Sequence, residues 1–129
     1  MIVLDSDHCI ELLRGRLDVR DWAAADELLA VTTITVGELV HGARRSAQPE
    51  RNLARVEVLL AAVEVLPFGE AAARRFGLLK ADLERSGQRL ADLDLQIAAT
   101  CIASGATLAT HNLRHFGRIE GLAVIDWLA

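Results

Sequence analysis

Short apolar runs alternate with amphipathic stretches along the chain, as strands alternate with helices. Five runs predict short buried strands over residues 2–4, 30–34, 63–66, 106–110 and 123–125. Between them, apolar residues at helical spacing predict helices over residues 6–16, 19–30, 35–46, 50–62, 69–86 and 92–104, and a helical turn over 112–116. We therefore expect an α/β fold in three layers, with a central, mainly parallel five-stranded sheet covered by helices on both faces.

Length and composition indicate one folded domain. The chain has 129 residues, 52% of them hydrophobic and 25% charged, so we expect a single domain over residues 1–129 with a substantial core. The longest uncharged stretch, residues 95–110, is too short and too polar to span a membrane. Residues 1–4 lack the basic start of a signal peptide. Two cysteines, Cys9 and Cys101, imply no disulfide framework, so we expect a cytoplasmic protein.

Polar side chains recur where a predicted strand ends or a following helix begins. In a parallel sheet these points lie along one edge, where such folds bind ligands. Residues far apart in the sequence should therefore meet there. The residues at these points are Asp5, Asp7, Glu38, Asp92, Asp94 and Asn112.

Several of these residues also have a structural interpretation. Glu38 lies three residues after Thr35, as in a capping box. Asp92 is well placed to cap its helix, and Asp7 in a first helical turn is favoured by the helix dipole. Asp5 lacks such an explanation, because a carboxylate directly after a buried strand is costly to bury without a partner. Asp94, set among apolar residues, has only a weak one.

A cluster of carboxylates needs a cation. Two carboxylates about 4 Å apart repel by about 4 kcal/mol at an effective dielectric constant of about 20. No Lys or Arg occupies these positions, so a divalent ion is the expected partner, and oxygen ligands favour Mg²⁺, with Mn²⁺ as a substitute. Such a site suits hydrolysis of a phosphodiester by activated water.

Four segments resemble the PIN-domain family, and more narrowly the VapC-type toxins of bacterial toxin–antitoxin pairs. They are IVLDSDHCIELLRG, ITVGELVHGA, ADLDLQIAATCIASGATLATHNLRHF and RIEGLAVIDW, and they cover essentially the whole chain. The resemblance implies a Mg²⁺-dependent endoribonuclease that a VapB-type antitoxin inhibits. It also implies a homodimer of the free toxin, a toxin–antitoxin hetero-oligomer, and an antitoxin tail that lies in an apolar groove and directs an Arg or similar group to the acids.

The resemblance assigns roles to particular residues. The three family acids fall on Asp5, Glu38 and Asp94, as catalytic residues and metal ligands, with Ser6 as polar support. A fourth acid, found in many members, falls on Asn112, an amide that can give only polar support. This departure leaves open whether one or two metals bind, and Asp92 is the candidate extra ligand.

RNA binding by a chain of net charge −4 requires local cations. Arginines near the predicted edge are candidates to hold phosphates, with Arg14, Arg44 and Arg114 preferred over Arg16, Arg45 and Arg118. The five Phe and Trp residues are scattered, so we expect no platform for base stacking.

Other functions remain as alternatives. Asp5 and Asp7 form a DxD after the first strand, as in phosphatases of the haloacid dehalogenase type, with Asp5 as nucleophile and Asp7 as acid–base. That family also needs a Lys near a late strand, and the only one here is Lys80 in mid-helix. A second alternative is an inactive PIN-fold module that binds a partner, which the amide at Asn112 favours. His111 and His115 lie four residues apart, a weak zinc signal.

Overall fold

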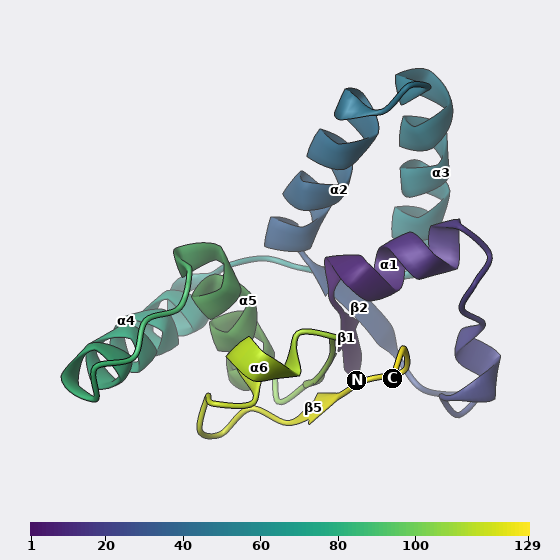
Figure 1. Cartoon of the computed structure of the whole chain (residues 1–129). Helices are drawn as coiled ribbons and strands as arrows, with labels where there is room; N and C mark the ends of the chain where they lie inside the picture. The colour runs from purple at the N-terminus through teal and green to yellow at the C-terminus, as the bar shows by residue number, and fades with distance from the viewer.

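The computed structural model describes all 129 residues and has the predicted alternation of strands and helices (Figure 1). The strands are β1 (Ile2–Leu4), β2 (Leu29–Thr32), β3 (Glu64–Leu66), β4 (Thr107–Ala109) and β5 (Val124–Ile125). The helices are α1 (Ser6–Leu13), α2 (Thr33–Arg45), α3 (Pro49–Ala62), α4 (Glu70–Arg85), α5 (Asp92–Ala103) and α6 (Leu113–Phe116), with a 3₁₀ turn η1 (Val19–Asp21). None of the helices combines the length and apolar character that crossing a membrane requires.

The five strands form one sheet in the order β3-β2-β1-β4-β5. All four neighbouring pairs are parallel, so the predicted sheet is confirmed. The central strand β1 pairs with β2 on one side and with β4 on the other, and Ile2 is opposite both Leu29 and Thr107. The chain therefore adds β2 and β3 on one side of β1, and then adds β4 and β5 on the other side.

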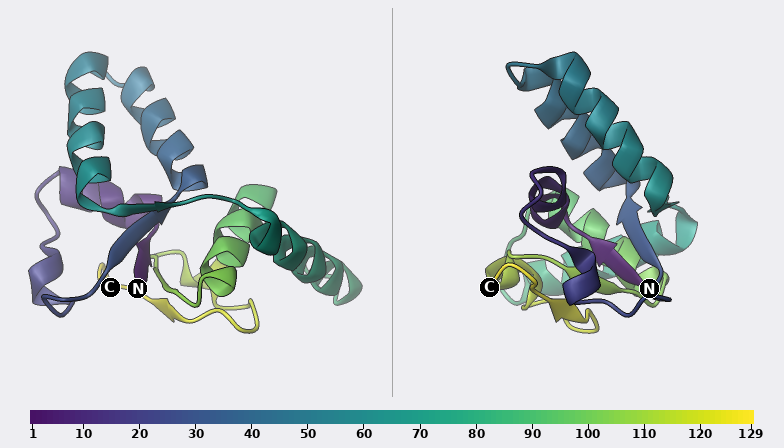
Figure 2. Two further views of the ribbon diagram at one scale, coloured as in Figure 1. Left: turned by 180° about the vertical axis from the view of Figure 1, so that it is seen from behind. Right: turned by 90° about the vertical axis from the view of Figure 1, so that its right-hand side faces the viewer.

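Alternating side chains of the strands give the sheet two buried faces. Val3 and Leu108 pack into a core with residues of α4, α5 and α6, whereas Ile2 and Leu4 pack into a second core with residues of α1, α2 and α3. Helices therefore cover both faces, as the three-layer prediction requires (Figure 2). In Figure 1, α2 and α3 form a hairpin that rises from the sheet beside α1.

The predicted helix over residues 19–30 is wrong. Only η1 is helical in this region, and strand β2 already begins at Leu29. The apolar and β-branched run of residues 28–32 supplies a strand whose Ala30 and Val31 are fully buried beside β1. Tertiary pairing therefore overrode the helical propensity of the alanines before it. Helix α1 is also shorter than predicted, because it ends at Leu13, just before Gly15 adopts a φ of 72°.

The predicted capping box at Thr35 and Glu38 is also wrong. Helix α2 begins two residues earlier, at Thr33, and its N-cap is Thr32. The Thr32 hydroxyl oxygen accepts a hydrogen bond from the Thr35 N–H at 3.2 Å. Glu38 therefore lies in the second turn of α2 and has no capping role.

We expect Phe116→Ala to lower the free energy of unfolding by about 3–5 kcal/mol, because the Phe116 ring is fully buried in the core that α6 shares with α5. Leu113→Ala on the same short helix is the matched control. Its side chain is 43% exposed, so its loss should stay within about 0.5 kcal/mol. Urea denaturation measures both values, and similar losses for the two variants would contradict the docking of α6 through Phe116.

Candidate active site

The site lies where the order of the strands reverses, beyond the carboxyl ends of β1 and β4. Asp5 follows β1 and Thr110 follows β4, and the Thr110 hydroxyl donates to Asp5 Oδ2 at 2.8 Å. The other oxygen of Asp5 accepts from the Ser6 N–H at 2.9 Å. Ser6 therefore supports Asp5 through its backbone. Asp5 itself is 7% exposed, so its carboxylate has one buried and fixed orientation.

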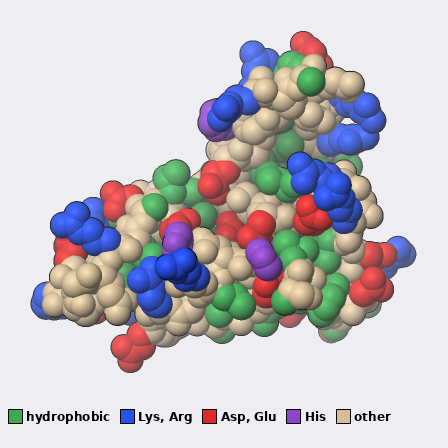
Figure 3. Space-filling model, in the orientation of Figure 1, with side chains coloured by type: hydrophobic (Ala, Val, Ile, Leu, Met, Phe, Trp, Pro, Cys, Tyr) green, Lys and Arg blue, Asp and Glu red, His purple; other side chains and the backbone are tan.

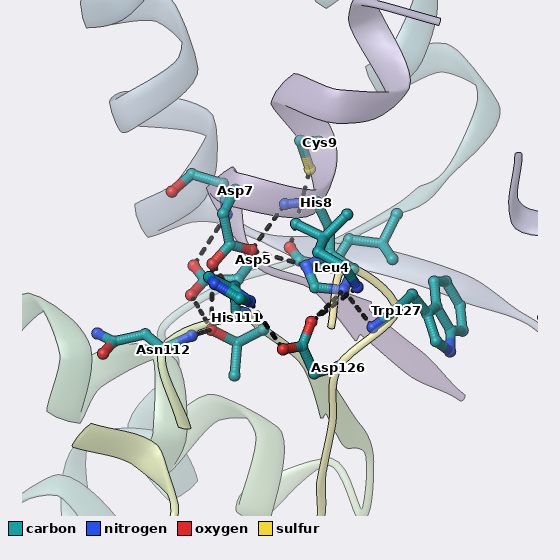
Figure 4. Close-up of polar contacts among 12 residues, drawn as sticks. Leu4, Asp5, Asp7, His8, Cys9, His111, Asn112, Asp126 and Trp127 are labelled. Atoms are coloured by element: carbon teal, nitrogen blue, oxygen red, sulfur yellow. Dashed lines mark hydrogen bonds and ion pairs between the residues drawn. The ribbon is translucent and has the colours of Figure 1, made fainter. Parts of the chain in front are cut away.

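Asp7 joins three separate parts of the chain. Its Oδ2 accepts from the His111 N–H at 2.9 Å, and its Oδ1 accepts from the His8 ring Nδ1 at 2.7 Å. The other ring nitrogen of His8, Nε2, accepts from the Trp127 N–H at 3.0 Å (Figure 4). Burial raises the pKa of Asp7, but hydrogen bonds from His8 and His111 outweigh it and lower the pKa below its ordinary value. These hydrogen bonds favour the ionised form of Asp7, which connects the three segments.

Glu38 has the opposite environment. Its Oε1 atom is buried and makes no hydrogen bond with any part of the chain. Burial and the negative charges of Asp5, Asp94 and Asp7 raise the pKa of Glu38. A buried carboxylate oxygen without a partner lowers the stability of the fold. We therefore expect a cation or a hydrogen-bond donor from outside the chain to bind to it.

Asp94 completes the cluster from the first turn of α5. Its side chain is 24% exposed, and its Oδ2 lies 3.4 Å from the His115 ring Nδ1. Burial is the main reason why the pKa of Asp5 is raised, and the charges of Asp7 and Asp94 add to the rise. The hydrogen bonds from Thr110 and Ser6 oppose it. The three predicted acids therefore meet at one place, and no Lys or Arg forms an ion pair with any of them.

The cluster suits a divalent cation by its chemistry. Its donors are carboxylate oxygens, which Mg²⁺ and Mn²⁺ prefer, and the unpartnered Oε1 of Glu38 is free to coordinate. In the orientations of the side chains here, no three His, Cys, Asp or Glu groups are arranged to hold one ion. Binding a metal therefore requires these side chains to turn toward it. Glu38 can turn without breaking a hydrogen bond at Oε1.

Comparison with known proteins identifies the family and the fold. A profile of the PIN domain matches residues 2–122. The chain belongs to the PIN-domain family. It is 35% identical over 127 residues to the tRNA(fMet)-specific endonuclease VapC of Salmonella typhimurium, covering 97% of this chain and 96% of the relative. It is 38% identical over 125 residues to Ribonuclease VapC10 of Mycobacterium tuberculosis, covering 95% and 90%.

Solved structures place this PIN domain with the VapC toxins. The chain superposes on the DNA-bound VapBC of Salmonella typhimurium with a TM-score of 0.90 and 34% identity, over 98% of this chain and 97% of that one. It superposes on the VapBC2 complex of Rickettsia felis, bound to a fragment of promoter DNA, with a TM-score of 0.90 and 29% identity, over 98% and 99%. The resemblance found in the four sequence segments is thus confirmed.

Two further polar residues of the PIN domain, Asp92 and Asn112, contact other side chains instead of the three acids. Asp92 is the first residue of α5 and not its cap, and its carboxylate accepts from the Lys80 ammonium at 3.0 Å. The expectation that Asp92 caps the helix is therefore wrong, and as an extra metal ligand it would first have to leave Lys80. The Asn112 side-chain amide nitrogen lies 2.9 Å from His115 Nδ1, so Asn112 supports the site through that ring.

The candidate phosphate-binding arginines lie at the ends of α1 and α2 and on α6. Figure 3 shows acidic side chains across the middle of one face, with histidines beside them and Lys and Arg groups to either side. Arg14 lines a groove that also contains Glu38, and its Nη1 lies 3.5 Å from Glu11 Oε1. Arg44 and Arg114 are exposed at the end of α2 and on α6, and neither forms an ion pair.

Sequence reasoning missed two residues of the site. The sequence predicts Thr110 as part of a strand, although a hydroxyl directly after a buried strand at the switch point could have marked it. His8 gave no signal, because its role depends on Trp127, 119 residues later. The idea that His111 and His115 share a zinc ion is wrong, since His111 Nδ1 pairs with Asp126 Oδ2 at 2.8 Å while His115 faces Asp94.

We expect Glu38→Gln to raise the melting temperature by a few degrees near neutral pH when divalent ions are removed with EDTA. The pKa of Glu38 is raised on folding, so its contribution to stability is full below the ordinary glutamate pKa and is lost as pH rises through the raised value. A neutral side chain removes that loss, and the gain should shrink as the pH is lowered toward the ordinary carboxyl range.

Glu57→Gln, on the exposed face of α3, is the control for a general charge effect. It should leave the melting temperature nearly unchanged at every pH. A gain for Glu38→Gln that does not vary with pH would contradict the electrostatic origin, because the helix and the side-chain volume are the same in both forms.

Proposed function

We propose that this PIN domain is a Mg²⁺-dependent endoribonuclease and the toxin of a type II toxin–antitoxin pair. It hydrolyses RNA phosphodiester bonds with an activated water, and a cognate VapB-type antitoxin inhibits it. Its relatives are named as ribonucleases, one of them specific for tRNA(fMet), which makes tRNA the first RNA class to test. We further propose that residues 1–129 act as one domain in the cytoplasm, where cellular RNA is available.

One observation carries the proposal. Asp5, Glu38 and Asp94 come from three elements and meet at the switch point without a cation, and Glu38 has a buried oxygen without a partner. A chain that did not use these carboxylates would gain stability by replacing any one of them. The presence of all three carboxylates in one cluster supports a bound divalent ion.

Each acid has a distinct part in the reaction. When bound, Mg²⁺, or Mn²⁺ in its place, lowers the pKa of water and neutralises charge on the phosphodiester. Asp5 provides an oxygen in a fixed orientation, because Thr110 and the Ser6 N–H hold the carboxylate. Glu38 offers its unpartnered oxygen to a ligand or to the attacking water, and Asp94, 24% exposed, contributes a third carboxylate from α5.

Arginines around the acids supply the attraction for RNA that the net charge of −4 does not. Arg114 stands on α6 beside His115, and Arg14 borders the groove that begins at Glu38. Arg44 is exposed further along α2. We assign these three arginines to phosphate contacts on either side of the bond that is cut.

The antitoxin occupies a groove between α1, α2 and α3. The groove has a volume of about 420 Å³, and Glu38 lies in its wall. Its apolar lining is Ile10, Leu13, Leu39, Ala43 and Val56. An extended or helical segment with apolar side chains fits here, and a basic side chain at its end would reach the acids. Two solved neighbours are VapBC complexes, which supports this partner. We also propose that the free toxin forms a homodimer, and that toxin and antitoxin form a hetero-oligomer.

The alternatives have less support. A phosphatase of the haloacid dehalogenase type needs Asp7 as a proton donor, but the bonds from His8 and His111 lower the pKa of Asp7. An inactive partner-binding module would have no use for a buried, unpartnered Glu38. Calorimetric titration with Mn²⁺ separates the proposal from that module, which would bind no metal.

We expect Asp5→Asn, Glu38→Gln and Asp94→Asn each to lower the rate of RNA cleavage by more than about 100-fold, since even residues that only hydrogen-bond to a metal ligand contribute about 10–100-fold. Sequencing of RNA ends after brief expression of the free protein identifies the substrate, and cleavage of that RNA by the purified variants gives the rates. Bacterial growth reports the same loss as reduced toxicity.

Asp92→Asn is the matched control on α5, because it removes a carboxylate that faces Lys80 instead of the cluster. It should keep nearly full activity and affinity for Mn²⁺. Undiminished cleavage by the Asp5 or Asp94 variant would overturn the assignment of the site, and loss of metal affinity in the Asp92 variant would make that residue a ligand.

We expect Gly42→Trp to abolish inhibition by the antitoxin while RNA cleavage continues. Gly42 lines the groove, and a Cβ atom added there meets no atom within 4 Å, so we expect a Trp ring to project into the groove while α2 stays intact. Gly77→Trp on α4 is the control, since it is equally unobstructed and lies away from the groove. Cleavage assays with added cognate antitoxin measure the effect, and normal inhibition of the Gly42 variant would place the antitoxin elsewhere.

A further inference from the structure

His115 is held beside the acidic cluster by the core and by two polar neighbours. It belongs to the short helix α6, which the buried ring of Phe116 fixes against α5. The His115 Nδ1 atom lies 2.9 Å from the Asn112 side-chain nitrogen and 3.4 Å from Asp94 Oδ2. The side chain is 44% exposed, so one edge of the ring faces solvent next to Asp94.

The contact with Asn112 decides which ring nitrogen carries the proton. An amide nitrogen can only donate, so Nδ1 of His115 must accept, and the proton of the neutral ring lies on Nε2. Nδ1 is then not a donor to Asp94, which agrees with the longer distance of 3.4 Å. The Nε2–H group makes no hydrogen bond within the chain and is available to a ligand.

We propose that the Nε2–H of His115 donates a hydrogen bond to a non-bridging oxygen of the RNA phosphate that is cut, and that Asn112 fixes the required tautomer. The inference rests on the proposed function. A site built from carboxylates repels a phosphodiester, so a neutral donor at its border helps to hold the phosphate and to stabilise the charge that develops on it. Asn112 at the position of the family's fourth acid therefore serves a ring that binds substrate.

A competing role for His115 is to position Asp94 through Nδ1. The two roles use opposite edges of the ring, so two amide substitutions separate them. The amide nitrogen of Gln reaches the place of Nε2, whereas the amide of Asn reaches the place of Nδ1. His115→Gln keeps the proposed donor and loses the contact with Asp94, and His115→Asn does the reverse.

We expect His115→Asn to lower the single-turnover rate of RNA cleavage roughly 100-fold, as for loss of one donor to a transition-state oxygen, and His115→Gln to stay within about 10-fold of the original protein. The affinity for Mn²⁺, measured by calorimetry, should be unchanged in both variants. If His115 instead positions Asp94, the order of the two rates reverses and the Gln variant binds Mn²⁺ more weakly. Either change would overturn the proposal.

Two further measurements support the test. Nitrogen NMR of the labelled imidazole shows the proton on Nε2 if Asn112 sets the tautomer, and a proton on Nδ1 would contradict it. Asn112→Ala should release this preference and lower the rate about 10-fold. The original protein and Asp94→Asn serve as reference. If neither cleaves RNA, the proposed function fails. If only the original protein cleaves and the Gln and Asn variants show the reversed order, this inference alone fails.

Discussion

Repulsion between carboxylates gathered beyond β1 and β4 is the constraint on which the rest of the site depends. Beyond the effect of burial, the charges of Asp5 and Asp94 raise the pKa of Glu38, the charge of Asp94 raises the pKa of Asp5, and the chain places no Lys or Arg among them. Two such charges about 4 Å apart repel by about 4 kcal/mol at an effective dielectric constant of about 20. Only rigid elements can hold them together, and here Asp5 follows β1 at the start of α1, whereas Glu38 lies on α2 and Asp94 on α5.

The structure divides the acids into two groups by their partners. Asp7 accepts hydrogen bonds from His8 and His111, and Asp92 accepts one from Lys80. Glu38 has a buried oxygen with none, and Asp5 is held in place yet keeps a raised pKa. Sequence position alone could not separate the groups, because all of these acids lie near helix beginnings. Asp7 and Asp92 stabilise the frame through their partners, whereas the unpartnered oxygen of Glu38 remains for a ligand.

The sequence allowed prediction of the parallel sheet, its two covered faces and the convergence of three acids, because these follow from local periodicity and from the geometry of parallel strands. It did not allow prediction of the 3₁₀ turn in place of a helix over residues 19–30, since pairing of β2 with β1 decides that region. The N-cap at Thr32 was likewise hidden, because a Thr at a strand end and a Thr at a helix start look alike in sequence.

The contacts most distant in sequence explain why the candidate active site depends on both ends of the chain. His8 accepts from the backbone of Trp127 and donates to Asp7, which in turn holds the backbone of His111. The segment from Thr110 to Phe116 is thereby fixed at its start by Asp7 and at its end by the buried ring of Phe116. Asn112 and His115 lie between these two anchors. Their geometry beside Asp94 is therefore a consequence of core packing.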